Sequence, residues 1–124
     1  MKVYLLAPLI FMLVTATNKC KSKKETTGYK GRLEVKGMCM NYTIKLLEGN
    51  LDPSKLVAEW KNEVTGKTYN NVFALGSVCN FPSTISEGDE FYFTIDTTYV
   101  SNCAVCLAYY PKPGKSIALK VVNK

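Results

Sequence analysis

The sequence contains no histidine. Catalytic sites in which an imidazole activates a serine or cysteine nucleophile are therefore excluded. Helical periodicity is also missing, because no stretch repeats apolar residues at helical spacing over three turns. The apolar run at residues 3–14 is shorter than the about 20 residues that a permanent membrane-spanning helix needs. These absences indicate a small β protein without a recognisable catalytic group.

A basic folded surface is missing as well, although the chain carries a net charge of +6. The whole excess lies in residues 1–36, and residues 37–124 hold equal numbers of lysines and acidic residues. A nucleic-acid-binding protein needs its basic residues clustered on a folded face. The sequence therefore predicts a domain that does not bind nucleic acid.

The N-terminus has the form of a secretory signal. Lys2 precedes the apolar run, and polar residues end that run abruptly. We expect residues 1–19 to be a signal peptide, and Cys20 to become the lipidated first residue of a bacterial lipoprotein. Lys19 departs from that pattern, in which a small residue stands directly before the cysteine. Cleavage after Ala16 without lipidation is the alternative.

The remainder of the chain divides into a tether and one domain. Residues 20–28 are polar and rich in lysine, and we expect them to form a solvated basic tether. Residues 29–124 are expected to form a single β domain. A domain of this size buries a modest core, so covalent cross-links often supplement its stability.

Apolar and polar residues alternate with period two along most of the domain, which is the pattern of half-buried strands. A single helical turn is expected after Asp52, which would cap it, with Pro53 at the first helical position. The predicted strands cover residues 32–36, 41–46, 56–61, 68–75, 90–96, 103–110 and 117–121.

Six or seven short strands in a domain of this size must curl into a barrel or stack as a sandwich, since a flat open sheet would leave edges and one face uncovered. We predict an all-β fold, a small closed or partly open barrel of the oligonucleotide/oligosaccharide-binding (OB-like) type. The run EGDEFYF resembles a turn and strand of such barrels. An immunoglobulin-like β-sandwich is the alternative. The barrel analogy by itself implies no ligand.

Three stretches of the domain read KGMCMNYTI, VCNFPSTISEGDEFYF and NCAVCLAYYP. Together they resemble small exported lipoproteins of Bacteroidetes that have no assigned activity. The resemblance implies a location in the bacterial cell envelope, in the periplasm or as an outer-membrane lipoprotein. It also implies contact with a membrane through an acylated Cys20. It carries no catalytic motif.

The cysteines decide most of the remaining chemistry. Setting Cys20 aside leaves four, an even number suited to pairing in an oxidising compartment: Cys39, Cys79, Cys103 and Cys106. The last two form a C-x-x-C pair. Thioredoxin-like redox activity needs such a pair at a helix N-terminus, whereas this pair opens a predicted strand. Zinc modules typically carry two close ligand pairs, and this chain has one. Structural disulfides are therefore expected.

The spacing limits how those disulfides can connect. In an extended strand, residues three apart lie about 10 Å from each other and point to opposite faces, while a disulfide needs Cα atoms within roughly 7 Å. Cys103 and Cys106 are therefore not expected to bridge each other. We expect each to pair with Cys39 or Cys79, and the spacing leaves open which pairs with which.

Aromatic side chains offer a second kind of site. Aromatic rings stack on sugars and bind apolar groups, so five of them are candidates for a ligand face: Trp60, Tyr69, Tyr92, Tyr109 and Tyr110. Packing across neighbouring strands is the competing role for each ring.

The sequence thus favours a non-enzymatic envelope protein with a binding or structural role, without a cofactor or metal. Its partner, a protein or a small ligand, and its oligomeric state are left open. The alternative is an exported thiol-redox or zinc-dependent protein that uses the Cys103/Cys106 pair.

Overall fold

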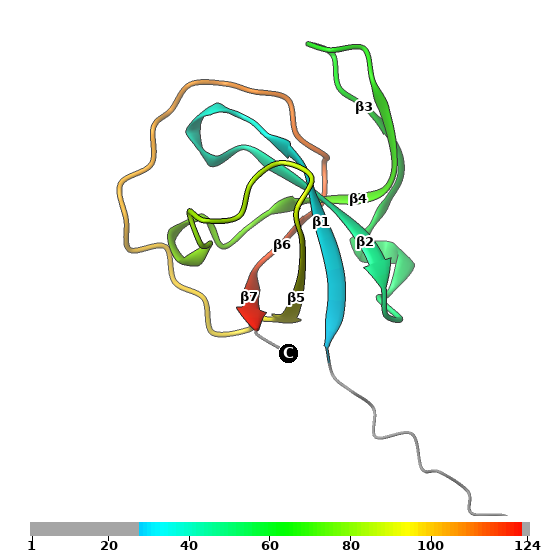
Figure 1. The fold of residues 1–124 in the computed structure, drawn as a ribbon. Coiled ribbons are helices and arrows are strands. Elements are labelled where there is room, and N and C mark those ends of the chain that lie inside the picture. The colour runs from blue at the N-terminus through cyan, green and yellow to red at the C-terminus, as the bar shows by residue number, and fades with distance from the viewer. Residues whose placement is uncertain (1–27, 123–124) are drawn as a thin grey trace, which may run out of the picture.

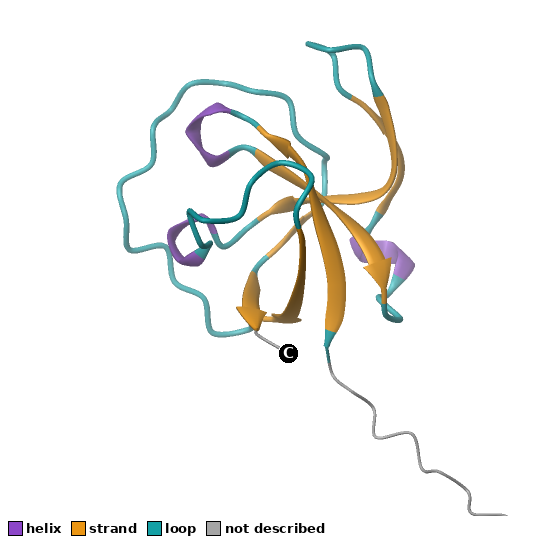
Figure 2. Cartoon of the chain, in the orientation of Figure 1, coloured by secondary structure: helices purple, strands orange, loops and turns teal. Residues whose placement is uncertain are grey.

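The computed structural model describes residues 28–122 (Figure 1). The predicted signal peptide, Cys20 and nearly all of the tether lie outside the described residues. Within the described part there are seven strands, three 3-10 turns and no α-helix (Figure 2). The strands are β1 (Tyr29–Lys36), β2 (Tyr42–Glu48), β3 (Val57–Lys61), β4 (Thr68–Leu75), β5 (Glu90–Ile95), β6 (Ser116–Ile117) and β7 (Leu119–Val122). The 3-10 turns are η1 (Met38–Met40), η2 (Pro53–Lys55) and η3 (Val78–Asn80).

The strands belong to one sheet, with the order β3-β4-β2-β1-β5-β7 and antiparallel pairing throughout that path. β6 pairs in parallel with β4, and Ala118 alone separates it from β7. The C-terminal segment therefore pairs with β4 first and with β5 next, which curls the sheet into a partly open barrel (Figure 1). The predicted all-β, partly open barrel is confirmed.

Hydrogen bonds outside the strand ladders fasten the C-terminal segment to the barrel. The Gly76 N–H donates to the Ile117 carbonyl at 2.8 Å. The fully buried Ser77 hydroxyl donates to the Leu119 carbonyl at 2.7 Å and accepts from the Leu119 N–H at 2.8 Å. A buried hydroxyl is costly unless it is paired, so this reciprocal pair stabilises the closure.

The core fills the inside of the curled sheet. Phe93 is completely buried, and its ring packs against those of Tyr29, Phe73 and Phe91 with centroids 5.4–6.0 Å apart. Such a side chain contributes about 1.5–3 kcal/mol by its removal from water. The buried cluster comprises Leu33, Tyr42, Ile44, Leu51, Phe73, Leu75, Phe81, Phe91, Phe93, Ile117 and Leu119.

Most predicted elements are present. Residues 32–36, 41–46, 56–61, 68–75 and 90–96 fall on β1 to β5, and η2 forms where the single turn was expected. There the Asp52 carboxylate accepts a hydrogen bond from the Ser54 N–H at 2.9 Å. The last predicted strand is divided into β6 and β7, because one segment pairs with two different strands.

The prediction of a core strand at residues 103–110 is wrong. These residues carry no strand, and every residue from Ser101 to Tyr109 is exposed. Strand sequence alone does not make a strand, because the backbone also needs a neighbouring edge with which to pair. Here disulfides bond the chain to η1 and η3, and none of residues 103–110 pairs with a strand.

Candidate functional site

The longest connection in the domain joins β5 to β6. We call residues 96–115 the β5–β6 loop. It contains no helix or strand, and Figure 1 shows it as a wide arc, coloured yellow to orange, on the outside of the barrel. Figure 2 shows η1 and η3 inside that arc. Structureless loops longer than about 12–15 residues are uncommon in compact domains, and ordered ones are usually functional.

Two disulfides attach the loop to the barrel. Cys79 of η3 is bonded to Cys103, with Cα atoms 5.6 Å apart, and Cys39 of η1 is bonded to Cys106, with Cα atoms 5.1 Å apart. The prediction that the C-x-x-C cysteines bridge distant partners rather than each other is confirmed. The structure also selects one of the two pairings that the spacing left open. Two such bonds fit an oxidising, exported environment.

The η1 turn has an unusual backbone conformation and contacts the β5–β6 loop. Cys39 and Met40 both adopt left-handed backbone conformations, with φ of 58° and 60°. Such conformations cost free energy in residues other than glycine, and the surrounding contacts have to maintain them. One contact is Asn41, whose side-chain amide donates to the carbonyls of Met38 at 2.9 Å and of Ala108 at 3.3 Å. The amide thus connects the turn to the loop beside the disulfide.

The end of the loop is held by Tyr110. Its ring packs at Gly37, where an added Cβ would lie only 2.5 Å from a ring carbon. Its hydroxyl accepts a hydrogen bond of 3.3 Å from the side-chain amide of Asn62, which is fully buried. The Asn62 side-chain oxygen accepts from the Val64 N–H at 2.9 Å. Sequence reasoning missed Asn62, although an asparagine three residues before Thr65-Gly66 is a typical turn signal.

Between these attachments the loop presents apolar side chains to solvent. The exposed fractions are 43% for Val105, 96% for Leu107 and 80% for Tyr109. We call these three residues the apolar face. Between them, Cys106 is bonded to Cys39, and the backbone carbonyl of Ala108 accepts from the Asn41 side chain. Val100, earlier in the loop, and Met38, in η1, add further exposed apolar surface.

An open pocket of about 310 Å³ lies beside the Cys39–Cys106 bond, and both cysteines line it. Its lining includes Val105 of the loop together with Leu75 at the end of β4 and Gly76 directly after it. Val105, the least exposed residue of the apolar face, therefore borders this pocket as well as solvent.

The five candidate aromatic residues occupy several parts of the domain. Trp60 of β3 and Tyr69 of β4 stack with ring centroids 5.8 Å apart. Burial, followed by the charges of Glu34 and Glu87 and by nearby Tyr110, raises the pKa of Tyr69 above its usual value. These three rings thus belong to one neighbourhood beside the β3–β4 hairpin.

The other two candidate rings lie elsewhere. Tyr92 lies on β5, where the Lys30 ammonium group is 5.6 Å from its ring centroid. Tyr109 belongs to the apolar face of the loop. Cross-strand stacking therefore accounts for the Trp60–Tyr69 pair, and Tyr109 is the candidate ring most open to a partner.

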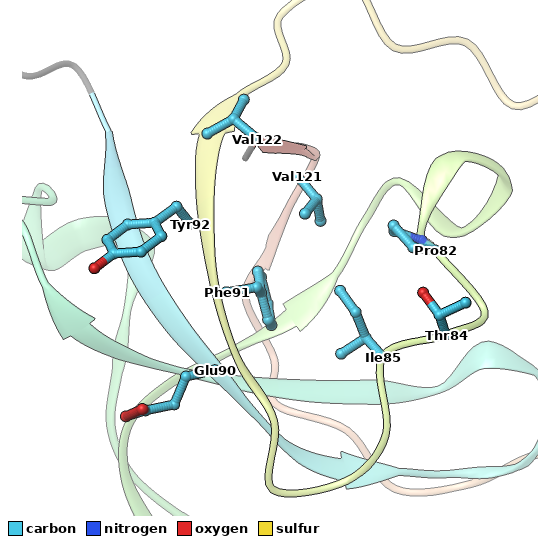
Figure 3. Close-up of a pocket in the computed structure, with 8 residues that line it drawn as sticks. All are labelled: Pro82, Thr84, Ile85, Glu90, Phe91, Tyr92, Val121 and Val122. Atoms are coloured by element: carbon cyan, nitrogen blue, oxygen red, sulfur yellow. The ribbon is translucent and has the colours of Figure 1, made fainter. Parts of the chain in front are cut away.

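A cleft of about 700 Å³ opens between β5, β7 and the segment that precedes β5 (Figure 3). Its lining residues are Pro82, Thr84, Ile85, Glu90, Phe91, Tyr92, Val121 and Val122. In Figure 3, Phe91, Ile85 and Val121 point toward one another, while Tyr92 and Glu90 lie on the other side of β5. The cleft has an apolar floor, and Glu90 is the one carboxylate among its lining residues.

Among residues 28–122, no group of three or more histidine, cysteine, aspartate or glutamate side chains is arranged to hold a metal ion. The same part of the chain contains no helix long and apolar enough to cross a bilayer. No protein-family model, curated protein or solved structure matches the chain, so its function has to be argued from its own geometry.

Proposed function

We propose that this protein is an exported, membrane-anchored β-barrel of the bacterial cell envelope that binds a protein partner through the apolar face of its β5–β6 loop. One observation carries the proposal. Two disulfides three residues apart hold a segment in which Leu107 is 96% exposed and every neighbouring residue from Ser101 to Tyr109 is exposed.

The energetics of association support this role. Ordering a flexible loop during binding costs free energy, and a loop that is already fixed avoids most of that cost. Exposed apolar side chains gathered in one place also mark interaction sites on soluble proteins. Leu107 and Tyr109 are the groups whose burial against a partner would contribute most.

The compartment follows from separate observations. The disulfides fit an oxidising environment, the leader has the form of a secretory signal, and the resemblance to Bacteroidetes lipoproteins favours the cell envelope. Intact mass of the mature protein tests the anchor. A diacylglyceryl adduct on Cys20 is expected, and an unmodified chain that begins at residue 17 would exclude it.

Binding can be tested in living cells with a photoreactive amino acid in place of Leu107. The matched control carries the same group in place of Val64, which is 65% exposed on the turn between β3 and β4. Illumination should produce a discrete covalent adduct from position 107 and none from position 64. Equal adducts from both positions, or no adduct from position 107, would overturn the proposal.

The thiol-redox or zinc-dependent alternative has no observation in its favour. Each sulfur of the Cys103/Cys106 pair is bonded to a cysteine of a different 3-10 turn, so neither is a thiolate able to attack a disulfide or bind a metal. Intact mass with and without reduction would show a shift for both bonds, whereas a free C-x-x-C pair would react with alkylating agents before reduction.

A further inference from the structure

Residues 104–110 have the sequence of a strand but not its pairing. The chain runs from Ala104 to Pro113 without a turn or bend. Among the described residues 28–122, no backbone-to-backbone hydrogen bond involves residues 97–114. An extended segment with unpaired N–H and C=O groups is a template for another strand.

One edge of this segment is turned toward the barrel and the other is open. The Ala108 carbonyl accepts from Asn41, so the edge that carries it faces η1. In an extended chain, the backbone groups of successive residues point to opposite edges. The edge away from η1 therefore carries the N–H and C=O groups of the apolar face, Val105, Leu107 and Tyr109.

The charge and the ends of the segment restrict what can pair with it. Residues 97–111 contain no charged side chain. Pro111 and Pro113 follow directly, both are buried, and neither has an N–H to donate. The open edge is thus short and uncharged, and the prolines prevent a partner strand from extending along it toward β6.

We propose that a second copy of this chain occupies the open edge, by antiparallel pairing of the two β5–β6 loops about a two-fold axis through Leu107. The inference rests on the proposed binding role of the loop and names its partner. In this register Leu107 lies opposite its own copy, and Val105 lies opposite Tyr109 of the second chain. The three residues then exchange about six backbone hydrogen bonds.

Self-complementarity favours a second copy over an unrelated peptide. A β-branched residue opposite an aromatic residue is a favourable cross-strand pair, and the two-fold axis forms the Val105/Tyr109 pair twice. The absence of charge in residues 97–111 means that no like charges face each other. On the second edge the Ala108 carbonyl already accepts from Asn41, and Cys106 is bonded to Cys39 of η1, so we expect pairing to end at a dimer rather than continue into a fibre.

Sedimentation of the mature, disulfide-intact protein tests the register through charges placed at the axis. L107E and L107K should each weaken self-association by roughly tenfold or more, since like charges directly opposite each other are destabilising. An equimolar mixture of the two variants should restore the dimer. Leu107 is 96% exposed, so neither change touches the core, and V64E serves as the control that leaves association unchanged.

A second pair of variants tests which residues face each other. A chain with V105K and Y109E places opposite charges across the axis and should still dimerise, whereas a chain with V105K and Y109K should not. A wild-type protein that stays monomeric up to about 1 mM, or a mixture of L107E and L107K that stays monomeric, would overturn the self-pairing.

The photoreactive variant at position 107 separates this inference from the proposed function. An adduct to a second copy supports both. An adduct to a different protein overturns the self-pairing and leaves the binding role intact. The absence of any adduct overturns both.

Discussion

The two disulfides should contribute unequally to stability, in an order that follows from how their loops are nested. Cys39–Cys106 spans 67 residues and encloses Cys79–Cys103, which spans 24. When both are present, the inner bond closes a loop of about 24 residues. The outer bond then closes a path of about 44 links, from Cys39 to Cys79, across the inner bond and on to Cys106.

The chain-entropy relation converts these loops into free energies. Replacing both Cys39 and Cys106 with alanine removes the path of 44 links and should lower the free energy of unfolding by about 4 kcal/mol. Replacing Cys79 and Cys103 lengthens the outer loop to about 67 residues rather than removing it. The net loss is then about 3 kcal/mol. Loss of both bonds should cost about 7 kcal/mol.

Urea unfolding of the three variants and the wild type, monitored by circular dichroism, measures these differences. A difference of about 1 kcal/mol corresponds to roughly 4–8 °C in melting temperature for a domain of this size, so thermal unfolding provides a second measurement. The reasoning would be refuted if loss of the inner bond cost as much as loss of the outer one, or more.

Three further predictions concern side chains with defined surroundings. Phe93→Ala should lower the free energy of unfolding by about 3–5 kcal/mol, because it leaves a cavity in the core, while Tyr109→Ala should change it by less than about 0.5 kcal/mol; urea unfolding checks both. Asn62→Ala should cost about 1–3 kcal/mol in the same assay, because the buried amide organises the β3–β4 turn and the end of the loop. Spectrophotometric titration should show Tyr69 ionising at higher pH than an exposed tyrosine, and Glu34→Gln should lower its pKa. Because the native state then retains a proton that the unfolded state has lost, stability should fall as pH rises above about 10. A titration of Tyr69 that is unchanged in Glu34→Gln would contradict this assignment.

The strands of the barrel could be predicted because the patterns that specify them involve residues close together in the sequence. In β5, apolar Phe91, Phe93 and Ile95 alternate with polar neighbours, and this alternation fixes which face is buried wherever the strand pairs. Asp52 and Pro53 likewise specify η2 through a side-chain cap and a fixed φ. Such features depend on near neighbours in the chain, so the sequence displays them.

The loop could not be predicted because its conformation depends on what lies beside it in space. Residues 103–110 satisfy every local criterion of a strand, but disulfides bond this segment to η1 and η3, and none of its residues pairs with a strand. The spacing of the cysteines excluded a bond between Cys103 and Cys106. It could not distinguish the remaining pairings, because they depend on how η1 and η3 are placed around the arc.

The arrangement of the bonds also determines what a protease can achieve. Exposed loops are the usual sites of proteolytic cleavage. A cut between Cys79 and Cys103 leaves two pieces joined by both disulfides, and a cut between Cys103 and Cys106 leaves them joined by Cys39–Cys106. A nicked molecule therefore remains one covalent assembly, and a single cleavage in this part of the chain releases no fragment.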